Sequence, residues 1–207
     1  MTRRWLPAFA AVGALGIAIV TARGRGHDLD RRLYGLVNRA RGPVSDAFFK
    51  GITEFGSIWA SGGAAVTLGA QRHRREAVDA FGAALSMWAV GQALKRIVGR
   101  PRPYAALPEF RLLIAKPRGT TWPSSHPAVV LAFVTVAARD LDLSPSLKAG
   151  LVALPVLVAA SRVYLGVHFP ADVAGGLLLG RAVGDAWSSL ISPFVLGRVP
   201  SISAPVQ

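Results

Sequence analysis

The chain of 207 residues contains no cysteine, and only 11 of its residues are acidic against 24 that are basic. The absence of cysteine excludes disulfide bonds, thiolate nucleophiles and cysteine metal sites, and it leaves the redox compartment open. The few acidic residues form no cluster that suggests a metal site, so neither a metal nor a cofactor is expected. No internal repeat occurs, and the length predicts one domain over residues 1–207, with flexible tails at 1–4 and 196–207.

The shortage of acidic residues leaves a net charge of +13, which indicates a negatively charged partner. Nucleic acid, an anionic bilayer surface and an anionic substrate all meet that description. Nucleic acid is the least favoured, because the basic residues lie in short loops without a basic helix face or zinc-finger spacing. Several arginines also fit a solvated or headgroup-facing loop, among them Arg23, Arg25, Arg31 and Arg32.

Apolar sequence is abundant, at 52% of the residues with a mean hydropathy of +0.40, which favours the membrane class. The first run, residues 5–22, is free of charge over 18 residues. As a helix it would be about 27 Å long, close to the thickness of a bilayer core. The runs predict an all-α integral membrane bundle of about six transmembrane helices. The expected spans are 5–22, 51–71, 77–94, 127–138, 149–161 and 173–190.

Three of these spans have an alternative interpretation. The basic start before the first run also fits a signal peptide, but Thr21-Ala22-Arg23 is a poor cleavage site. A retained first helix is therefore favoured. The runs 127–138 and 149–161 are short enough to be buried helices of a soluble protein, and their place among the other spans favours the membrane.

Three further features have structural interpretations. Residues 23–50 mix apolar side chains with charges, which fits an interfacial amphipathic segment. Gly176 and Gly180 form a small-xxx-small pair typical of close helix packing. Arg181 and Asp185, four residues apart, are spaced for a structural ion pair on one helix face.

Three short clusters carry residue types suited to phosphate chemistry. In chain order they read KRIVGRPRP (95–103), PSSH (123–126) and SRVYLGVHFPAD (161–172). The 19 residues between the first two form a surface loop, and the 34 between the second and third allow one helix down and one back. All three clusters are therefore expected at the same face of the bundle.

The first cluster supplies basic groups. A helix that ends near Gly99 places Lys95 on its last turn, and Arg102 in the following loop offers a bidentate fork for phosphate oxygens. For this cluster alone, a basic loop at the membrane interface is the favoured interpretation. Arg96 and Arg100 are assigned to that interface.

The second cluster combines hydroxyl groups with a histidine. Ser124 or Ser125 can cap the next helix and leave backbone N–H groups for an anion. His126 then lies on the first turn, where it can donate a proton. On its own, the motif fits a helix cap beside a surface histidine equally well.

The third cluster is the most specific of the three. Asp172 follows His168 by four residues, so its carboxylate can hold one ring N–H and leave the other nitrogen as a nucleophile. Arg162 offers another phosphate fork six residues before the histidine. A lone His-x3-Asp pattern is usually structural, and only the company of the other two clusters favours catalysis.

Taken in order, the patterns K-x6-R-P, P-S-x-H and S-R-x5-H-x3-D resemble those of the type 2 phosphatidic acid phosphatase family of membrane lipid phosphatases. This family is related to bacterial acid phosphatases and vanadium haloperoxidases. Ser125 departs from the family's commonest second motif, which has glycine there. The matching residues are Lys95, Arg102, Pro103, Pro123, Ser124, His126, Ser161, Arg162, His168 and Asp172.

The resemblance implies a metal-independent reaction through a phosphohistidine. In it, His168 attacks phosphorus, Asp172 orients His168, and His126 protonates the leaving oxygen and later activates water. The resemblance also implies a site on the extracytoplasmic face of a bacterial cell membrane, for which the distribution of Lys and Arg gives no independent sign. The phosphate-binding residues it implies are Lys95, Arg102, Ser124, Ser125 and Arg162.

The leading prediction is a lipid phosphate or diphosphate phosphatase, with an undecaprenyl-type polyprenyl diphosphate as first substrate and phosphatidate or phosphatidylglycerophosphate as alternatives. A non-catalytic protein that binds anionic lipid is the second class, and it would need the arginines but not His168. A soluble enzyme of the acid phosphatase or haloperoxidase type is disfavoured by the first apolar run. The loop 104–122 is expected to anchor at the interface or to gate the site, through Phe110, Leu112, Leu113 and Trp122. The oligomeric state stays open.

Overall fold

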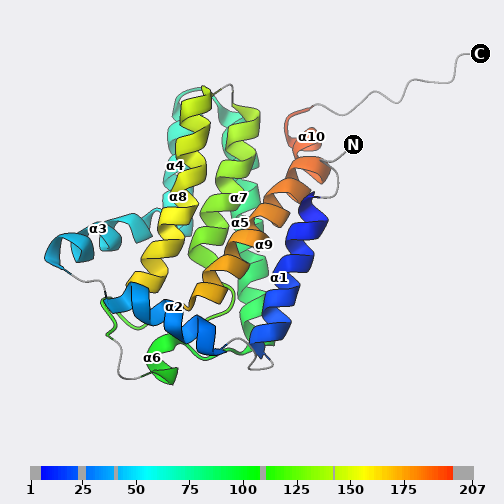
Figure 1. The fold of residues 1–207 in the computed structure, drawn as a ribbon. Coiled ribbons are helices and arrows are strands. Elements are labelled where there is room, and N and C mark those ends of the chain that lie inside the picture. The colour runs from blue at the N-terminus through cyan, green and yellow to red at the C-terminus, as the bar shows by residue number, and fades with distance from the viewer. Residues whose placement is uncertain (1–5, 23–26, 40–41, 108–110, 142, 198–207) are drawn as a thin grey trace, which may run out of the picture.

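The computed structural model describes residues 6–22, 27–39, 42–107, 111–141 and 143–197, which form ten helices and no strand. Six of the helices stand side by side as a bundle (Figure 1), as the apolar runs predicted. They are α1 (Leu6–Ala22), α4 (Ile58–Ala70), α5 (Arg74–Val98), α7 (Ser125–Asp140), α8 (Pro145–Tyr164) and α9 (Pro170–Leu190). The shorter helices are α2 (His27–Arg39), α3 (Pro43–Glu54), α6 (Pro103–Ala106) and α10 (Ser192–Val195).

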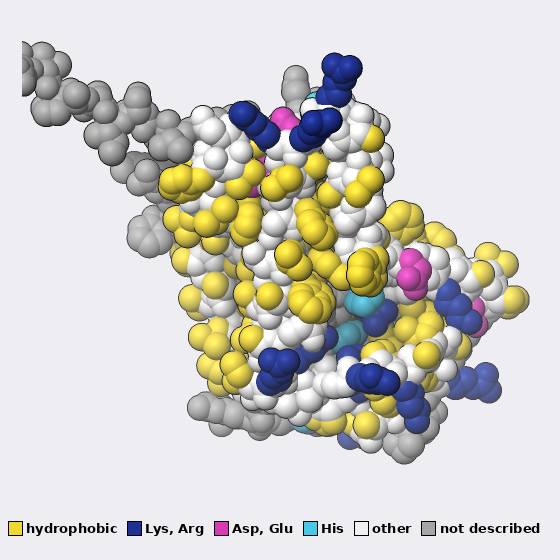
Figure 2. All heavy atoms as spheres, turned by 180° about the vertical axis from the view of Figure 1, so that it is seen from behind, with side chains coloured by type: hydrophobic (Ala, Val, Ile, Leu, Met, Phe, Trp, Pro, Cys, Tyr) yellow, Lys and Arg dark blue, Asp and Glu magenta, His cyan; other side chains and the backbone are white. Residues whose placement is uncertain are grey.

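The bundle is built for an apolar surrounding. Two helical segments, Arg74–Ala106 and Pro145–Tyr164, are long and apolar enough to cross a membrane, and Pro7–Thr21 and Ile58–Ala70 are shorter apolar helices. Apolar side chains cover much of the outer surface of the upright helices (Figure 2). An apolar exterior of this extent is typical of a protein that faces lipid.

The second predicted span, 51–71, is divided in the structure. Its first residues belong to α3, and α4 begins only at Ile58. The division follows from Ser57, whose hydroxyl caps α4 by accepting a hydrogen bond from the Ala60 N–H at 3.0 Å. Gly56 lies in the same break and packs closely on His126, which a side chain would prevent. The break between α3 and α4 thus places the Gly56 backbone directly against His126 of the second cluster.

Helix α7 is the centre of the bundle and packs against α4, α5, α8 and α9. Its buried side chains are small or β-branched, such as Ala128, Val129, Ala132 and Val136. Small side chains let the neighbouring backbones approach, and the β-branched ones lose little rotamer freedom on burial.

Helix α9 makes the closest approach to α7 through glycines. A Cβ atom on Gly180 would lie 2.8 Å from Ala128 Cα, and one on Gly176 would collide with the Ser124 carbonyl oxygen. The pair therefore is the packing face that its spacing predicted. On the exposed side of the same helix, Arg181 Nε donates to Asp185 Oδ2 at 2.7 Å, as the i,i+4 spacing predicted.

Helices α2 and α6 lie at one end of the bundle, and α3 projects sideways from beside α8 (Figure 1). Arg31 and Arg32, expected in a loop, are exposed residues of α2, whereas Arg23 and Arg25 lie outside the described residues. The amphipathic pattern of 23–50 becomes two helices because Gly42 and Pro43 separate them, with Pro43 at the first position of α3.

At the other end of the chain, the described residues continue to Gly197. Helix α10 forms at Ser192–Val195, and Leu196 is buried, with its carbonyl oxygen accepting a hydrogen bond from Arg75 Nη1 at 3.4 Å. The predicted tail at 1–4 lies outside the described residues, and so do residues 198–207 of the predicted tail at 196–207.

Substitution Gly180→Ala is expected to destabilise the α7–α9 contact by about 1–3 kcal/mol, the usual cost of overpacking against a backbone that cannot withdraw. The thermal unfolding midpoint of the detergent-purified protein measures the loss. Gly16→Ala is the control, because Gly16 on α1 has open space around its Cα and alanine favours a helix. Equal midpoints for the two variants would contradict the packing argument.

Candidate active site

Backbone hydrogen bonds tie the three sequence clusters together at the end of the bundle where α2 and α6 lie. Gly99 ends α5 in the left-handed conformation at φ 63°, as predicted, and turns the chain into the loop. The Thr121 N–H then donates to the Arg100 carbonyl at 2.9 Å, and the Ser124 N–H donates to the Asp172 carbonyl at 3.0 Å. The clusters therefore share one site, as their spacing predicted.

His168 lies in the loop between α8 and α9 and is 2% exposed. Its Nδ1 is 3.6 Å from Asp172 Oδ2, and the Thr121 hydroxyl lies between them, 3.0 Å from Nδ1 and 2.6 Å from Oδ2. An ionised carboxylate only accepts, so the Thr121 hydroxyl donates to Asp172 and accepts the proton of Nδ1. This arrangement leaves Nε2 without a proton.

Asp172 is fully buried near the start of α9, three residues after Phe169. Its Oδ2 also accepts a hydrogen bond from the Phe169 N–H at 2.7 Å, which stabilises the first turn of the helix. Its Oδ1 accepts from Arg100 Nη1 at 2.7 Å. The carboxylate is thus held by a cation, a hydroxyl and an amide before it acts on His168.

Arg100 is not the interface residue that the sequence predicted. It is 6% exposed, binds Asp172 and Asp30 at once, and lies 4.4 Å from the centre of the Phe169 ring. The turn at Gly99 directs it inward, whereas Arg96, one turn earlier on α5, is exposed. The prediction for Arg100 is therefore wrong, and only Arg96 points outward.

Arg102 lies beside Nε2 of His168. Its Nη1 is 3.4 Å from His168 Nε2 and also donates to the Val167 carbonyl at 3.1 Å, while its Nε donates to the Gly119 carbonyl at 2.9 Å. These carbonyls fix the guanidinium, which is 4% exposed. A fixed cation next to Nε2 can hold a phosphate oxygen at the point of attack.

Arg162, near the end of α8, is buried, and its Nη1 donates to the Thr53 hydroxyl at 2.7 Å. Its Nε has no hydrogen-bond partner within the described part of the chain. Buried guanidinium donors are rarely left unpaired, so the atom suits an anionic ligand. Lys95 is half-buried on the last turn of α5, where the positive charges of Arg102 and Arg162 repel its ammonium group.

The Ser124 and Ser125 hydroxyls are buried and also lack a partner among the described residues. Ser124 holds the N-cap position of α7, yet its side chain makes no capping hydrogen bond, contrary to expectation. His126 follows on the first helical turn, half-buried, and interacts electrostatically with Arg162 and His168. The two serine hydroxyls and His126 thus lie at the start of α7, on the side of the site where Arg162 and His168 lie.

Burial, together with the positive charges of Arg162, Arg102 and Lys95, lowers the pKa of His168 well below its ordinary value. The imidazole is therefore neutral at neutral pH. A neutral ring with its free nitrogen beside Arg102 can act as a nucleophile without first losing a proton. Histidine side chains lie among basic ones on the face of the molecule that Figure 2 shows.

Every predicted site residue lies in this site, but the sequence missed four that support it. All four are buried: Thr121 and Arg100 bind Asp172, Thr53 binds Arg162, and Asp30 binds Arg100. A signal existed only for Arg100, which stands in the first cluster. Asp30 and Thr53 come from segments far away in the chain, and their role depends on how α2 and α3 dock.

In the described part of the loop 104–122, only Leu107, Thr121 and Trp122 are buried. Trp122 is 2% exposed and packs on Gly175, so its prediction as an interfacial or gating residue is wrong. Leu112 and Leu113 are half-buried, and Phe110 lies outside the described residues. The loop contributes Thr121 and the Gly119 carbonyl that accepts a hydrogen bond from Arg102 Nε.

The family model described as the PAP2 superfamily matches residues 76–194, more than half of the chain. The chain belongs to the PAP2 superfamily. The resemblance seen in the three motifs is thereby confirmed.

Among curated PAP2 relatives, Decaprenylphosphoryl-5-phosphoribose phosphatase of Mycobacterium tuberculosis (strain ATCC 25618 / H37Rv) is 35% identical over 55% of this chain and 60% of its own length. Undecaprenyl-diphosphatase of Sulfolobus acidocaldarius is 36% identical over 50% of this chain and 47% of its own length. The chain thus spans about half to three-fifths of these relatives.

Two solved structures share the fold. LpxE of Aquifex aeolicus aligns over 78% of this chain and 95% of its own, with a TM-score of 0.71 and 28% identity. The transmembrane PAP2 type phosphatidylglycerolphosphate phosphatase of Bacillus subtilis aligns over 89% and 95%, with a TM-score of 0.73 and 22% identity, a likeness of fold alone. The predicted all-α membrane bundle is confirmed.

Substitution Lys95→Met is expected to weaken binding of inorganic phosphate by about ten- to a hundredfold, because one charge-assisted hydrogen bond contributes about 1.5–3 kcal/mol. Titrating phosphate against the thermal midpoint of the purified protein measures the affinity. Arg96→Met is the matched control, since Arg96 is the next residue on α5 and is exposed. Equal losses in the two variants would contradict a phosphate site at Lys95.

Proposed function

We propose that this PAP2 superfamily protein is a membrane lipid phosphatase that works through a phosphohistidine at His168, with a polyprenyl diphosphate of the undecaprenyl type as substrate. The observation that carries the proposal is how the ring of His168 is held. The Thr121 hydroxyl, which donates to Asp172, lies 3.0 Å from Nδ1, and the Arg102 guanidinium lies 3.4 Å from Nε2.

In the first step, His168 Nε2 attacks phosphorus, and the bond from phosphorus to the leaving oxygen breaks. His126, which the negative charge of the bound substrate keeps protonated, donates the proton that the leaving oxygen needs. The phosphorylated ring becomes positively charged, and the Thr121–Asp172 pair stabilises that charge from the Nδ1 side. The neutral His168 of the resting protein needs no prior deprotonation.

Basic side chains hold the phosphoryl oxygens during the transfer. Arg102 is fixed by backbone carbonyls, and Arg162 has an unpartnered buried Nε that would bind the incoming group. Lys95 adds a third cation, and the Ser124 and Ser125 hydroxyls add neutral donors. Preorganised donors of this kind stabilise the charge that spreads over the oxygens in the transition state.

In the second step, water attacks the phosphohistidine and the bond from phosphorus to Nε2 breaks. His126, left neutral by the first step, accepts the proton of that water and is ready for the next cycle. Inorganic phosphate leaves, and His168 returns to its neutral form.

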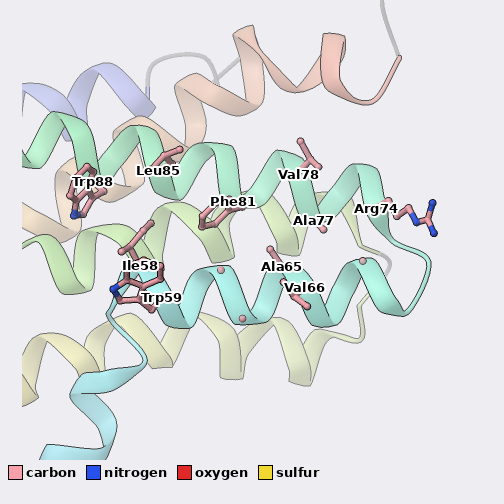
Figure 3. A pocket seen from close by; sticks show the side chains of 13 residues that line it. Ile58, Trp59, Ala65, Val66, Arg74, Ala77, Val78, Phe81, Leu85 and Trp88 are labelled. Carbon is pink, nitrogen blue, oxygen red and sulfur yellow. The ribbon is translucent and has the colours of Figure 1, made fainter.

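An apolar groove of about 820 Å³ between α4 and α5 supports a substrate with a long hydrocarbon chain (Figure 3). Ile58, Trp59 and Trp88 lie at one end and Arg74 at the other. Ile58, at the first of these ends, follows Gly56 by two residues, and Gly56 packs on His126. A lipid whose phosphate lies in the site can therefore rest its chain along this groove.

The names of the relatives support the choice of lipid. Two of them, quoted above, are named for decaprenyl- or undecaprenyl-linked phosphates. Phosphatidate and phosphatidylglycerophosphate remain the alternative substrates. A non-catalytic protein that binds anionic lipid remains the alternative of another class, and it needs no neutral nucleophile.

Detergent-purified protein is expected to release phosphate from undecaprenyl diphosphate in the presence of EDTA, and faster than from phosphatidate or phosphatidylglycerophosphate. His168→Ala is expected to lose activity by many powers of ten, because the nucleophile is removed. His73→Ala is the control, since His73 is exposed at the far end of α5. Undiminished release by His168→Ala would overturn the mechanism, and release by neither protein would favour the binding protein.

We also place the site on the extracytoplasmic face, and the natural absence of cysteine makes a direct test possible. Ala105→Cys marks the site end of the bundle and Ser146→Cys the opposite end, both at exposed positions. In intact cells, a membrane-impermeant maleimide is expected to label position 105 and to reach position 146 only after lysis. The reverse labelling pattern would show that the site faces the cytoplasm.

A further inference from the structure

Helix α2 buries a stripe of polar and aromatic side chains and exposes its leucines together with its remaining charged residues. Asp30, Tyr34 and Asn38, one helical turn apart, are 6%, 1% and 2% exposed, whereas Leu29 and Leu36 are 63% and 70% exposed. A helix on a water-soluble protein has the opposite polarity. The buried stripe of α2 must therefore find polar partners inside the protein.

Two residues of this stripe bind the ends of the loop that carries His168. Asn38 Nδ2 donates to the Tyr164 carbonyl at 3.1 Å, at the end of α8. The Tyr34 ring packs on the Phe169 ring with 5.5 Å between centroids, just before α9 begins. Helix α2 thus spans the loop from one side to the other.

The third residue, Asp30, reaches the catalytic carboxylate through Arg100. Asp30 Oδ1 accepts from the Ala171 N–H at 2.9 Å, and Asp30 Oδ2 accepts from Arg100 Nη2 at 2.5 Å. The other terminal nitrogen of the same guanidinium donates to Asp172 Oδ1 at 2.7 Å. One planar fork therefore joins a carboxylate of α2 to the carboxylate that orients the nucleophile.

The geometry of this triad leaves the guanidinium little freedom. Asp30, Arg100 and Asp172 are all buried, so each charge depends on the others for compensation. The Phe169 ring covers one face of the guanidinium at 4.4 Å. With Asp172 Oδ1 taken by Arg100, Oδ2 is left for Thr121 and, through it, for the ring of His168.

We propose that Asp30 is a positioning residue of the phosphatase reaction: it fixes the Arg100 guanidinium, which holds Asp172 in the orientation that keeps His168 Nε2 aimed at phosphorus. The inference rests on the proposed function of His168. It makes the peripheral helix α2 part of the catalytic machinery, although α2 supplies none of the proposed phosphate-binding groups.

Asp30→Asn isolates this role. The amide oxygen of asparagine can still accept from the Ala171 N–H, but its NH2 group cannot accept from Arg100. The expected result is a fall in kcat of about ten- to a hundredfold, the usual effect of losing a partner that orients a catalytic ligand. KM is expected to stay unchanged, because the phosphate-binding side chains keep their own partners.

The measurement compares kcat and KM of purified Asp30→Asn with those of wild type, on undecaprenyl diphosphate or whichever lipid of the panel wild type hydrolyses. Asp28→Asn is the matched control, since Asp28 is on the same helix and exposed. Thermal midpoints show that each variant is folded. A folded Asp30→Asn with kcat within about twofold of wild type, or with the loss in KM alone, would overturn the proposal.

Arg100→Lys provides a second variant if Asp30→Asn does not fold, because lysine keeps the charge but cannot bridge two carboxylates with a planar fork. This variant too is expected to have a lower kcat at constant KM. An unchanged kcat would contradict the proposal that Arg100 positions Asp172. Where both single variants fold, the double variant should lose no more than the worse single one. Losses that multiply would mean that the two residues act independently.

The His168→Ala variant separates this inference from the proposed function. If His168→Ala is inactive and Asp30→Asn is fully active, only the role of Asp30 fails. If His168→Ala retains activity, the phosphohistidine mechanism fails first, and the effect of Asp30 on it has no meaning.

Discussion

The buried negative charge of Asp172 is the constraint on which the site depends. A carboxylate with no access to solvent is stable only when cations and hydrogen-bond donors surround it. Arg100, the Thr121 hydroxyl and the Phe169 N–H fill that need, and each comes from a different stretch of chain. Pairing this one charge therefore draws the loop after α5, the segment before α7 and the start of α9 to one place.

Helix packing provides the frame within which that pairing takes place. Gly176 and Gly180 let α9 lie directly on the backbone of α7, close enough for the Ser124 N–H to bond the Asp172 carbonyl. The two halves of the site, the Ser124–His126 turn and the His168–Asp172 pair, are thus held by backbone rather than by flexible side chains. Rigid placement of this kind is what phosphoryl transfer demands, since positioning and electrostatics supply most of the catalysis.

Much of the fold was predictable because its signals are local. Apolar runs separated by charged turns predicted six bundle helices. The chain was expected to leave and return to the same face between the second and third clusters, and this predicted that all three clusters meet there. The failures have physical reasons as well. Arg100 and Arg96 look alike in sequence, and only the left-handed turn at Gly99 sends one inward. Trp122 resembles an interfacial anchor in sequence, but its ring is buried against Gly175, where the missing side chain leaves room for it.

Sequence by itself determined the family, the helical bundle and the candidate residues of the site, because short motifs and apolar periodicity are carried by neighbouring residues. Tertiary structure alone decided which partners make those residues work. Thr121 relays between His168 and Asp172, Thr53 holds Arg162, and Asp30 reaches Arg100 from a helix 70 residues earlier in the chain. Such contacts follow from how α2 and α3 dock, and no local pattern encodes a docking geometry that depends on the whole bundle.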